Sequence, residues 1–179
     1  DNLADAVGVT SSQVRKDFSI FGISGSKRGG YQIDSLIEKL NLILGKNEVH
    51  KVVIAGVGHI GSALIKYRGF DKEGIKVAAG FDIDAGKYDF QSQIPVLPLE
   101  EMKNYIRNNN IKIGIIAVPD IAAQQVLDIM VAAGIKGILN FAPLRLRVQD
   151  DIVINNVNLE LELENVIYFV NALDKTSTG

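Results

Sequence analysis

The sequence has 179 residues, of which 47% are hydrophobic and 22% are charged, as in an ordinary soluble globular protein. These values exclude a disordered chain, and no apolar run reaches the length of a membrane-spanning helix. Because the sequence contains no cysteine, it has no disulfide framework, no thiolate metal site and no thiol nucleophile. We therefore expect a cytoplasmic protein with no membrane partner and no metal site.

The net charge of −2 argues against a uniformly basic nucleic-acid binder, but the charge is distributed unevenly. Residues 10–31 contain four basic residues and one acidic residue, whereas residues 150–179 contain six acidic residues and one basic residue. We expect the two ends of the chain to have different functions.

The first 20 residues have the pattern of two short helices joined by a tight turn. Residues 2–7 are expected to form a helix that ends at Gly8, and a second helix is expected to begin at Thr10. Thr10 and Gln13 have the spacing of a capping box, in which the hydroxyl accepts from a first-turn N–H and the glutamine reaches back. In a helix-turn-helix, the second helix meets the edges of DNA bases. The residues that would face DNA are Ser11, Ser12, Gln13, Arg15 and Lys16. A helical hairpin with a solvated polar face explains this segment alone equally well.

The next stretch, residues 20–31, contains four glycines and carries Lys27 and Arg28 at its expected tip. This composition predicts a hairpin that presents two cations and has little core of its own. A basic hairpin directly after a recognition-type helix is the layout of a winged helix, so we favour DNA binding over a solvated loop. The residues expected to contact DNA here are Lys27, Arg28, Gly29, Gly30 and Tyr31.

Apolar residues then recur at three- and four-residue spacing between Ile33 and Leu44, which predicts an amphipathic helix closed by Gly45. We interpret this helix as the connector between two domains. The predicted organisation is a winged-helix domain with its linker helix at residues 1–45, a nucleotide-binding domain at residues 46–158 and a C-terminal helix at residues 159–179.

Residues 51–61 then give the clearest signal in the sequence. A buried strand runs into Gly56, Gly58 and Gly61, and a helix is expected to follow. In the dinucleotide-binding fingerprint, the first glycine permits the turn, the second lets the backbone approach a pyrophosphate, and the third lets helix and strand pack closely. A second strand ends on Asp82, 21 residues after Gly61, where a ribose-binding acid is expected.

From this motif onward, strands and helices alternate, which predicts a Rossmann-type, doubly wound parallel sheet in an α/β fold. We expect strands at 51–55, 75–81, 94–96, 113–118, 137–141 and 152–154, and helices at 60–67, 99–108 and 120–133, the last capped by Asp120. Ligands of such sheets lie at the carboxyl ends of the strands. The expected cofactor-binding residues are Gly56, Val57, Gly58, His59, Ile60, Gly61, Asp82, Ile83, Val118, Pro119, Asn140, Phe141, Ala142 and Pro143. The last six residues of this list, from Val118 to Pro143, have an equally good alternative explanation: a proline after a buried strand often serves only to end the strand.

The position and charge of Asp82 also indicate which dinucleotide binds. Its carboxylate is expected to accept from both adenine-ribose hydroxyls and to repel a 2′-phosphate, and the adjacent Ile83 and Asp84 supply no compensating cation. We therefore expect NADH and NAD as cofactors rather than their 2′-phosphorylated forms.

The last predicted helix, residues 159–173, has an apolar stripe opposite three glutamates. It is expected either to cover the sheet or to form a dimer.

Five segments together resemble the family of redox-sensing transcriptional repressors called Rex. They are VTSSQVRKDFSIFG (9–22), GSKRGGY (25–31), GVGHIGSAL (56–64), FDID (81–84) and AAGIKGILNFAP (132–143), and the resemblance covers nearly the whole chain. It implies a homodimer with an N-terminal winged helix that binds double-stranded operator DNA and a Rossmann domain that binds NADH or NAD. It also implies that NADH releases the repressor from DNA and that the C-terminal helix reaches across to the partner subunit.

The sequence departs from the family pattern in two places. The family's winged helix begins with one more helix than this sequence contains, which puts DNA binding by this chain in question. The family usually has an acidic residue where this chain has Asn158, near the contacts that couple the two domains.

The favoured function is a DNA-binding repressor that senses the NADH to NAD ratio, with no catalytic residues. The alternative is a small NAD-dependent oxidoreductase, to which the sequence offers only His50 and His59, no cysteine, and no tyrosine followed four residues later by lysine. A coenzyme A-binding domain of a synthetase would leave the basic N-terminal turn without a role.

Overall fold

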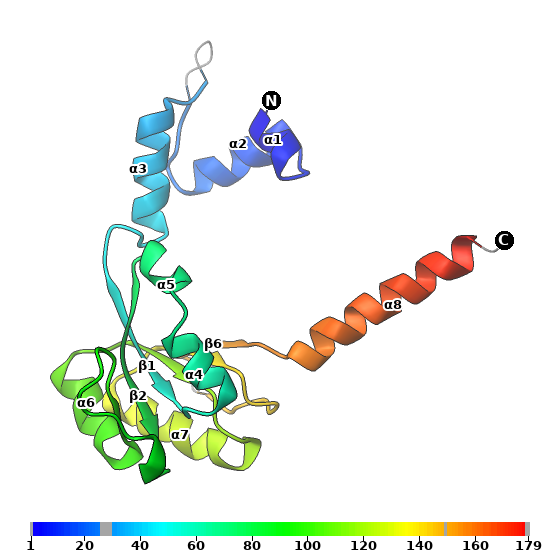
Figure 1. Ribbon diagram of the computed structural model, residues 1–179. Coiled ribbons are helices and arrows are strands. Elements are labelled where there is room, and N and C mark those ends of the chain that lie inside the picture. The colour runs from blue at the N-terminus through cyan, green and yellow to red at the C-terminus, as the bar shows by residue number, and fades with distance from the viewer. Residues whose placement is uncertain (1, 26–29, 149, 178–179) are drawn as a thin grey trace. The chain divides into compact units, whose positions relative to one another are not determined.

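The computed structural model describes residues 2–25, 30–148 and 150–177. The chain forms two compact units, Asp1–Val49 and His50–Gly179, and each has its own secondary structure (Figure 1). Within the described ranges, no helix is both long enough and apolar enough to cross a membrane.

The first unit contains helices α1 (Asn2–Ala6), α2 (Ser11–Ile20) and α3 (Ile33–Ile43). The Thr10 hydroxyl caps α2 by accepting from the Gln13 N–H at 3.2 Å. The predicted capping box is only half formed, because the Gln13 amide donates to the Asp17 carboxylate at 2.7 Å instead of reaching back to Thr10. Residues four apart on a helix are neighbours, so this polar pair competes directly with the predicted one.

The predicted hairpin begins later than expected, because α2 continues to Ile20 and the chain turns at Gly22, where φ is +66°. The two arms of the turn lie together: a Cβ added to Gly25 would be 3.0 Å from both the Gly30 carbonyl oxygen and the Tyr31 ring. The predicted tip residues Lys27, Arg28 and Gly29 lie outside the described residues.

The second unit is built on a six-stranded sheet in which every neighbouring pair is parallel, so the predicted α/β fold is confirmed. The strands are β1 (His50–Ala55), β2 (Ile75–Asp82), β3 (Val96–Pro98), β4 (Ile113–Ile116), β5 (Gly137–Asn140) and β6 (Val153–Asn156). Their order is β3-β2-β1-β4-β5-β6, so the direction of winding reverses between β1 and β4. In this topology the crevice at the reversal, outside the carboxyl ends of the strands, is where ligands bind.

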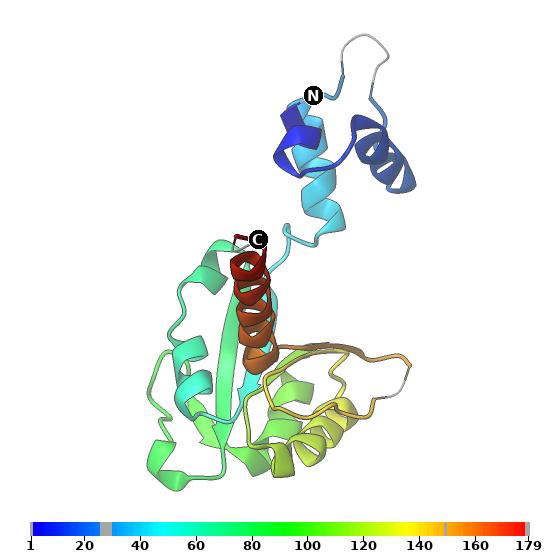
Figure 2. The same cartoon turned by 90° about the vertical axis from the view of Figure 1, so that its right-hand side faces the viewer.

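Helices cover both faces of the sheet (Figure 2). Short helices α4 (His59–Ile65) and α5 (Gly69–Lys72) pack on one face, and α6 (Met102–Asn108) and α7 (Asp120–Ala133) pack on the other. Side chains alternate along β1, so Val52 and Ile54 pack in the apolar cluster under α4 and α5, whereas Val53 packs in the cluster under α6 and α7. Burial on both faces explains why this strand reads as a continuous apolar run.

Several predicted boundaries shift by one to three residues. β3 and β6 begin later than expected, and the first turn of the helix predicted at 99–108 is a 3₁₀ turn, Leu99–Glu101. Asp120 is the first residue of α7 rather than its cap, and its carboxylate accepts from the Ile121 N–H at 2.8 Å.

A bulge interrupts β2, where Val52 pairs with Val77 but Val53 pairs with Ala79. The extra residue, Ala78, uses its carbonyl to accept a hydrogen bond from the Tyr105 hydroxyl at 3.0 Å. Burial raises the pKa of Tyr105, so this hydroxyl stays protonated and able to donate. Tyr105 thus supplies a hydrogen bond to the residue that the bulge leaves without a partner in the strand ladder.

The last helix, α8 (Leu159–Ser177), does not bury its apolar stripe within the single chain. Its large apolar side chains are exposed, with relative exposures between 50% and 68% for Leu159, Leu161, Leu163, Val166, Ile167, Tyr168, Phe169, Val170 and Leu173. An apolar surface of this extent typically marks a protein–protein interface.

Candidate functional site

A cleft of about 580 Å³ lies at the carboxyl ends of the central strands. It is formed by the glycine turn after β1, the end of β2 and the segments that follow β4 and β5, so it spans the point where the winding reverses. Ten of the fourteen predicted cofactor residues line it: Gly56, Gly58, His59, Ile60, Asp82, Ile83, Val118, Pro119, Phe141 and Pro143. Neighbouring strands in a sheet lie about 4.8 Å apart. The ends of four adjacent strands therefore form an elongated site roughly 14 Å across.

The three motif glycines have different surroundings. Gly56 has a φ of +90°, which favours glycine, and a Cβ there would overlap the Ala117 carbonyl. A Cβ on Gly61 would overlap the Gly56 carbonyl oxygen, so this glycine allows α4 to pack against the turn. By contrast, a Cβ on Gly58 would meet no atom within 4 Å. The backbone at Gly58 is therefore open to a ligand, as the fingerprint predicts.

Asp82 ends β2 at the edge of the cleft, and only 7% of its side chain is exposed. Its Oδ2 accepts from the Val57 N–H at 2.7 Å and from the Lys87 ammonium at 3.0 Å, and its Oδ1 accepts from the Asp84 N–H at 2.9 Å. Burial raises the pKa of Asp82, but the hydrogen bonds from Asp84, Lys87 and Val57 together outweigh it and leave the pKa below its ordinary value. The carboxylate is therefore ionised throughout the neutral pH range.

Lys87 is the functional residue that sequence reasoning missed most clearly. Only the adjacent Ile83 and Asp84, which carry no cation, were considered from the sequence, whereas a 3₁₀ turn, Ala85–Lys87, brings the Lys87 ammonium back to the end of β2. The Asp84 carboxylate stabilises that turn by accepting from the Gly86 N–H at 2.9 Å. The Asp-x-Gly sequence is a signal for such a turn, although it does not specify where the lysine side chain points.

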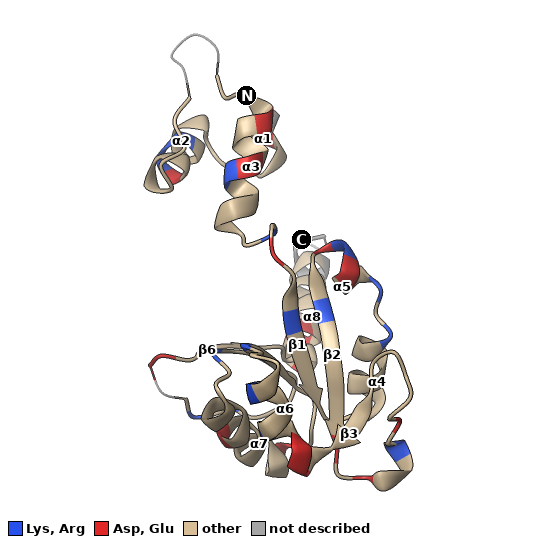
Figure 3. Cartoon of the chain, turned by 90° about the vertical axis from the view of Figure 1, so that its left-hand side faces the viewer, with Lys and Arg blue, Asp and Glu red and all other residues tan. Residues whose placement is uncertain are grey.

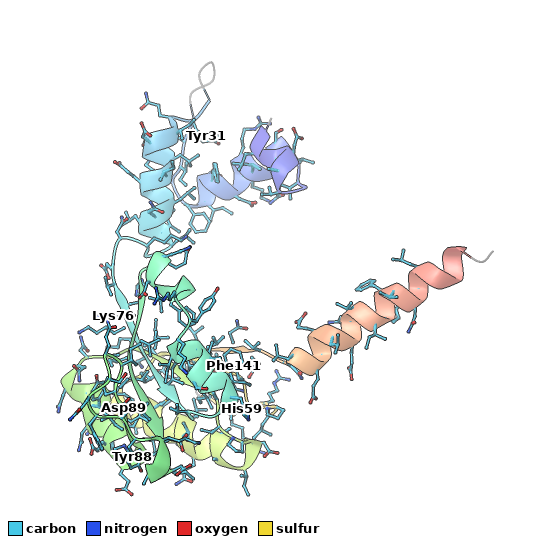
Figure 4. The ribbon with its side chains drawn as sticks, in the orientation of Figure 1. Tyr31, His59, Lys76, Tyr88, Asp89 and Phe141 are labelled. Atoms are coloured by element: carbon cyan, nitrogen blue, oxygen red, sulfur yellow. The ribbon has the colours of Figure 1, made fainter. Side chains whose placement is uncertain are left out.

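The other end of the cleft is apolar. Val118 and Pro119 follow β4, and Phe141 and Pro143 follow β5. Figure 4 labels Phe141 and His59, which come from different elements and line the same cleft. Seven further residues that line the cleft were not predicted as cofactor contacts: Phe81, Asp84, Lys87, Leu99, Ala117, Ala122 and Val126. Most of them belong to strand ends or to the first turns of α7, where only the three-dimensional packing decides which side chains face a ligand.

Asn140 was predicted to contact the cofactor, but it is fully buried and does not line the cleft. Its side-chain amide donates to the carbonyls of Ala142 and Leu144 at 3.2 and 3.0 Å and to the Asn156 amide oxygen at 2.9 Å. Its own oxygen accepts from the Ala142 N–H at 3.0 Å. Asn140 therefore fixes the turn that presents Phe141 to the cleft.

The remaining three predicted residues also lie behind the lining. Val57 contributes its N–H to Asp82, Gly61 packs α4 against the turn, and Ala142 is buried next to Asn140.

In the first unit, the predicted DNA-facing residues lie on α2, where Ser12, Gln13, Arg15 and Lys16 are exposed and Ser11 is half-buried. Basic residues are visible on this helix in Figure 3. The Phe18 ring packs edge-to-face on the Tyr31 ring, with centroids 5.1 Å apart, and so joins α2 to the base of the following turn. Gly30 is exposed at that turn with a φ of +66°.

Asn158 has a local structural role. Its side-chain oxygen accepts from the Leu161 N–H at 3.1 Å, which is the hydrogen bond of a residue that caps the start of α8. Asparagine and aspartate cap helices about equally well, so the departure from the family pattern preserves this capping bond.

Comparisons with known proteins agree with this geometry. Residues 47–144 match the family model for a CoA-binding domain. The redox-sensing transcriptional repressor Rex of Desulforamulus reducens is 43% identical over 164 residues, which are 91% of this chain and 78% of that protein. Rex of Ligilactobacillus salivarius is 38% identical over 175 residues, which are 97% of this chain and 82% of that protein.

Solved structures extend the likeness to three dimensions. The crystal structure of RSP with β-NAD⁺ and operator DNA matches 99% of this chain and 82% of that chain, with 35% identity and a TM-score of 0.90. The crystal structure of RSP with β-NADH covers 99% of this chain and 83% of that chain, with a TM-score of 0.84. RSP is itself described as a Rex-family repressor. From its sequence and its fold, this chain belongs to the Rex family of redox-sensing transcriptional repressors.

Proposed function

We propose that this chain is a DNA-binding transcriptional repressor that senses the NADH to NAD ratio, with NADH binding releasing it from operator DNA. The observation that carries the proposal is the combination, in one chain of this family, of a dinucleotide-type cleft with a helix-turn-helix unit. We further propose domains at residues 1–45, 46–158 and 159–179, and a cytoplasmic location, where operator DNA is accessible.

The cleft residues fit a dinucleotide. The open backbone at Gly58 and the free N–H groups of the first turn of α4 suit a pyrophosphate. The ionised carboxylate of Asp82 suits the two hydroxyl donors of an adenine ribose. These features support the assignment of the ten lining residues as the cofactor contacts and of Asn140 as a residue that positions them.

The apolar end of the cleft supports discrimination between the two redox states. A reduced nicotinamide ring is uncharged, whereas the oxidised ring carries a positive charge. Val118, Phe141 and Pro143 offer that charge no polar partner, so transfer from water costs the oxidised ring more free energy. The site should therefore favour NADH.

DNA binding is assigned to α2 and the basic turn that follows it. Arg15 and Lys16 are exposed on the helix and free of any hydrogen bond through their charged groups in the described contacts, so they suit phosphate oxygens. Lys27 and Arg28 would add the contacts of a wing.

The dimer is assigned to α8. Its exposed leucine, valine and aromatic side chains form an apolar surface that a second copy of the chain would bury. Burial of this surface in a homodimer would also bring two DNA-binding units to one operator, as two half-sites require.

Fluorescence anisotropy tests the proposal. Duplexes selected from a random library by the chain would be titrated with it, and NADH and NAD would then be added separately. We expect NADH to release the duplex at a lower concentration than NAD. Selection of no duplex, or equal release by the two forms, would contradict the proposal, and steady oxidation of NADH by a carbonyl compound would favour an oxidoreductase instead.

A further inference from the structure

The adenine-ribose end of the cleft contains a positive charge as well as a negative one. The Lys87 ammonium lies 3.0 Å from Asp82 Oδ2, and Lys87 lines the cleft with 37% of its side chain exposed. The charge that a ribose substituent meets is therefore set by a pair of residues rather than by Asp82 alone.

The hydrogen bonds of Asp82 show what this pair does. A carboxylate has about four lone-pair positions, and three of them are already occupied by Val57, Asp84 and Lys87. Two of these donors are backbone N–H groups that the fold holds in place, whereas the third is at the end of a flexible lysine. Two ribose hydroxyls can therefore both donate to Asp82 only when the Lys87 ammonium moves aside.

A displaced ammonium would remain within reach of the 2′ position of the same ribose. A 2′-phosphate carries close to two negative charges and accepts strongly from lysine, whereas Asp82 repels it. Asp84 also lines the cleft, and its carboxylate adds to the repulsion. To reach a phosphate, the Lys87 ammonium must leave the Asp82 carboxylate without a cationic partner next to that phosphate. The intact Asp82–Lys87 pair therefore disfavours phosphorylated dinucleotides.

We propose that Lys87 is a second specificity-determining residue. Its ammonium could bind the 2′-phosphate of a phosphorylated dinucleotide, but the ion pair with Asp82 keeps it occupied. The proposal rests on the proposed function, since it concerns the same dinucleotide cleft. It implies that the Asp82 carboxylate maintains the selection against NADPH. Loss of that carboxylate should raise the affinity for NADPH only while Lys87 is present.

Isothermal titration calorimetry with NADH and with NADPH tests this on the full chain and on Lys87→Met, Asp82→Asn and the double variant. We expect Asp82→Asn to bind NADPH more tightly than the unchanged chain. Addition of Lys87→Met should then weaken NADPH binding roughly tenfold, the loss of one charge-assisted hydrogen bond. Lys87→Met alone, which leaves Asp82 in place, should lower the affinity for NADPH relative to that for NADH.

Two matched variants separate a local effect from a change in net charge. Lys76→Met removes an exposed lysine on β2 that does not line the cleft (Figure 4), and it should leave the NADH to NADPH ratio unchanged. Asp84→Asn removes one carboxylate from the cleft without removing the partner of Lys87, so its gain in NADPH affinity should be smaller than that of Asp82→Asn.

The outcomes distinguish failure of the inference from failure of the proposed function. If Asp82→Asn and the double variant bind NADPH equally, or if Asp84→Asn gains as much as Asp82→Asn, Lys87 has no specificity role, although NADH binding stands. If the unchanged chain binds neither dinucleotide, the proposed function itself fails, and the inference fails with it.

Discussion

A change of Gly58 to alanine adds one methyl group to the side of the glycine turn that opens into the cleft. That methyl group would meet no protein atom within 4 Å, and the φ of −83° at this position is accessible to alanine. We therefore expect the free energy of unfolding to change by less than about 1 kcal/mol and the melting temperature by less than roughly 4 °C. The same methyl group would occupy the surface that a pyrophosphate approaches, so NADH affinity should fall about tenfold to a hundredfold.

A change of Gly61 to alanine is the matched control, because it adds the same methyl group on the packed side of the turn. There the Cβ would overlap the Gly56 carbonyl oxygen, and the backbone of α4 or of the turn must shift. Overpacking of this kind costs about 1 to 3 kcal/mol, or roughly 2 to 12 °C in melting temperature.

Differential scanning calorimetry and NADH titration of both variants measure the two effects separately. Gly58→Ala should lose affinity without losing stability, whereas Gly61→Ala should lose stability. If Gly58→Ala binds NADH as tightly as the unchanged chain, the glycine turn does not face the cofactor and the geometry of the proposed site is wrong.

Three further predictions concern the apolar end of the cleft, the DNA-binding helix and the dimer. Phe141→Asp should reduce the preference for NADH over NAD by about tenfold, because it places a negative charge where the oxidised ring would carry its positive one; an unchanged ratio in calorimetry would remove this pocket from the mechanism. Arg15→Ala should weaken operator binding and lower the salt slope by about one unit while leaving NADH affinity intact, and an unchanged slope would exclude a phosphate contact. Truncation before Leu159 should give a monomer in analytical ultracentrifugation that still binds NADH but is no longer released from DNA by it; a stable dimer would refute the role of α8.

The parts of the fold that could be predicted are those fixed by local sequence. Gly56 and Gly61 have conformations or contacts that tolerate no side chain, so the glycine spacing predicts both the turn and the packing of α4. The continuous apolar run of β1 predicts burial on both faces of a parallel sheet, and the structure confirms it.

The parts that could not be predicted depend on where a side chain points after a turn. Asn140 and Phe141 are adjacent, and the sequence does not decide which of them enters the cleft and which is buried behind it. Lys87 reaches Asp82 only because a 3₁₀ turn separates them. Gln13 had two possible partners on α2, and the nearby Asp17 took the place of the expected capping bond.

The central claim is that NADH and DNA bind to different states of the same repressor. Linkage requires that NADH weaken DNA binding by the same factor by which DNA weakens NADH binding. The most direct measurement is a closed thermodynamic cycle: the operator affinity of the dimer with and without saturating NADH, and its NADH affinity with and without saturating operator. We predict two equal factors, both larger than those measured with NAD. Operator affinity that is the same with NADH, with NAD and with neither would contradict it.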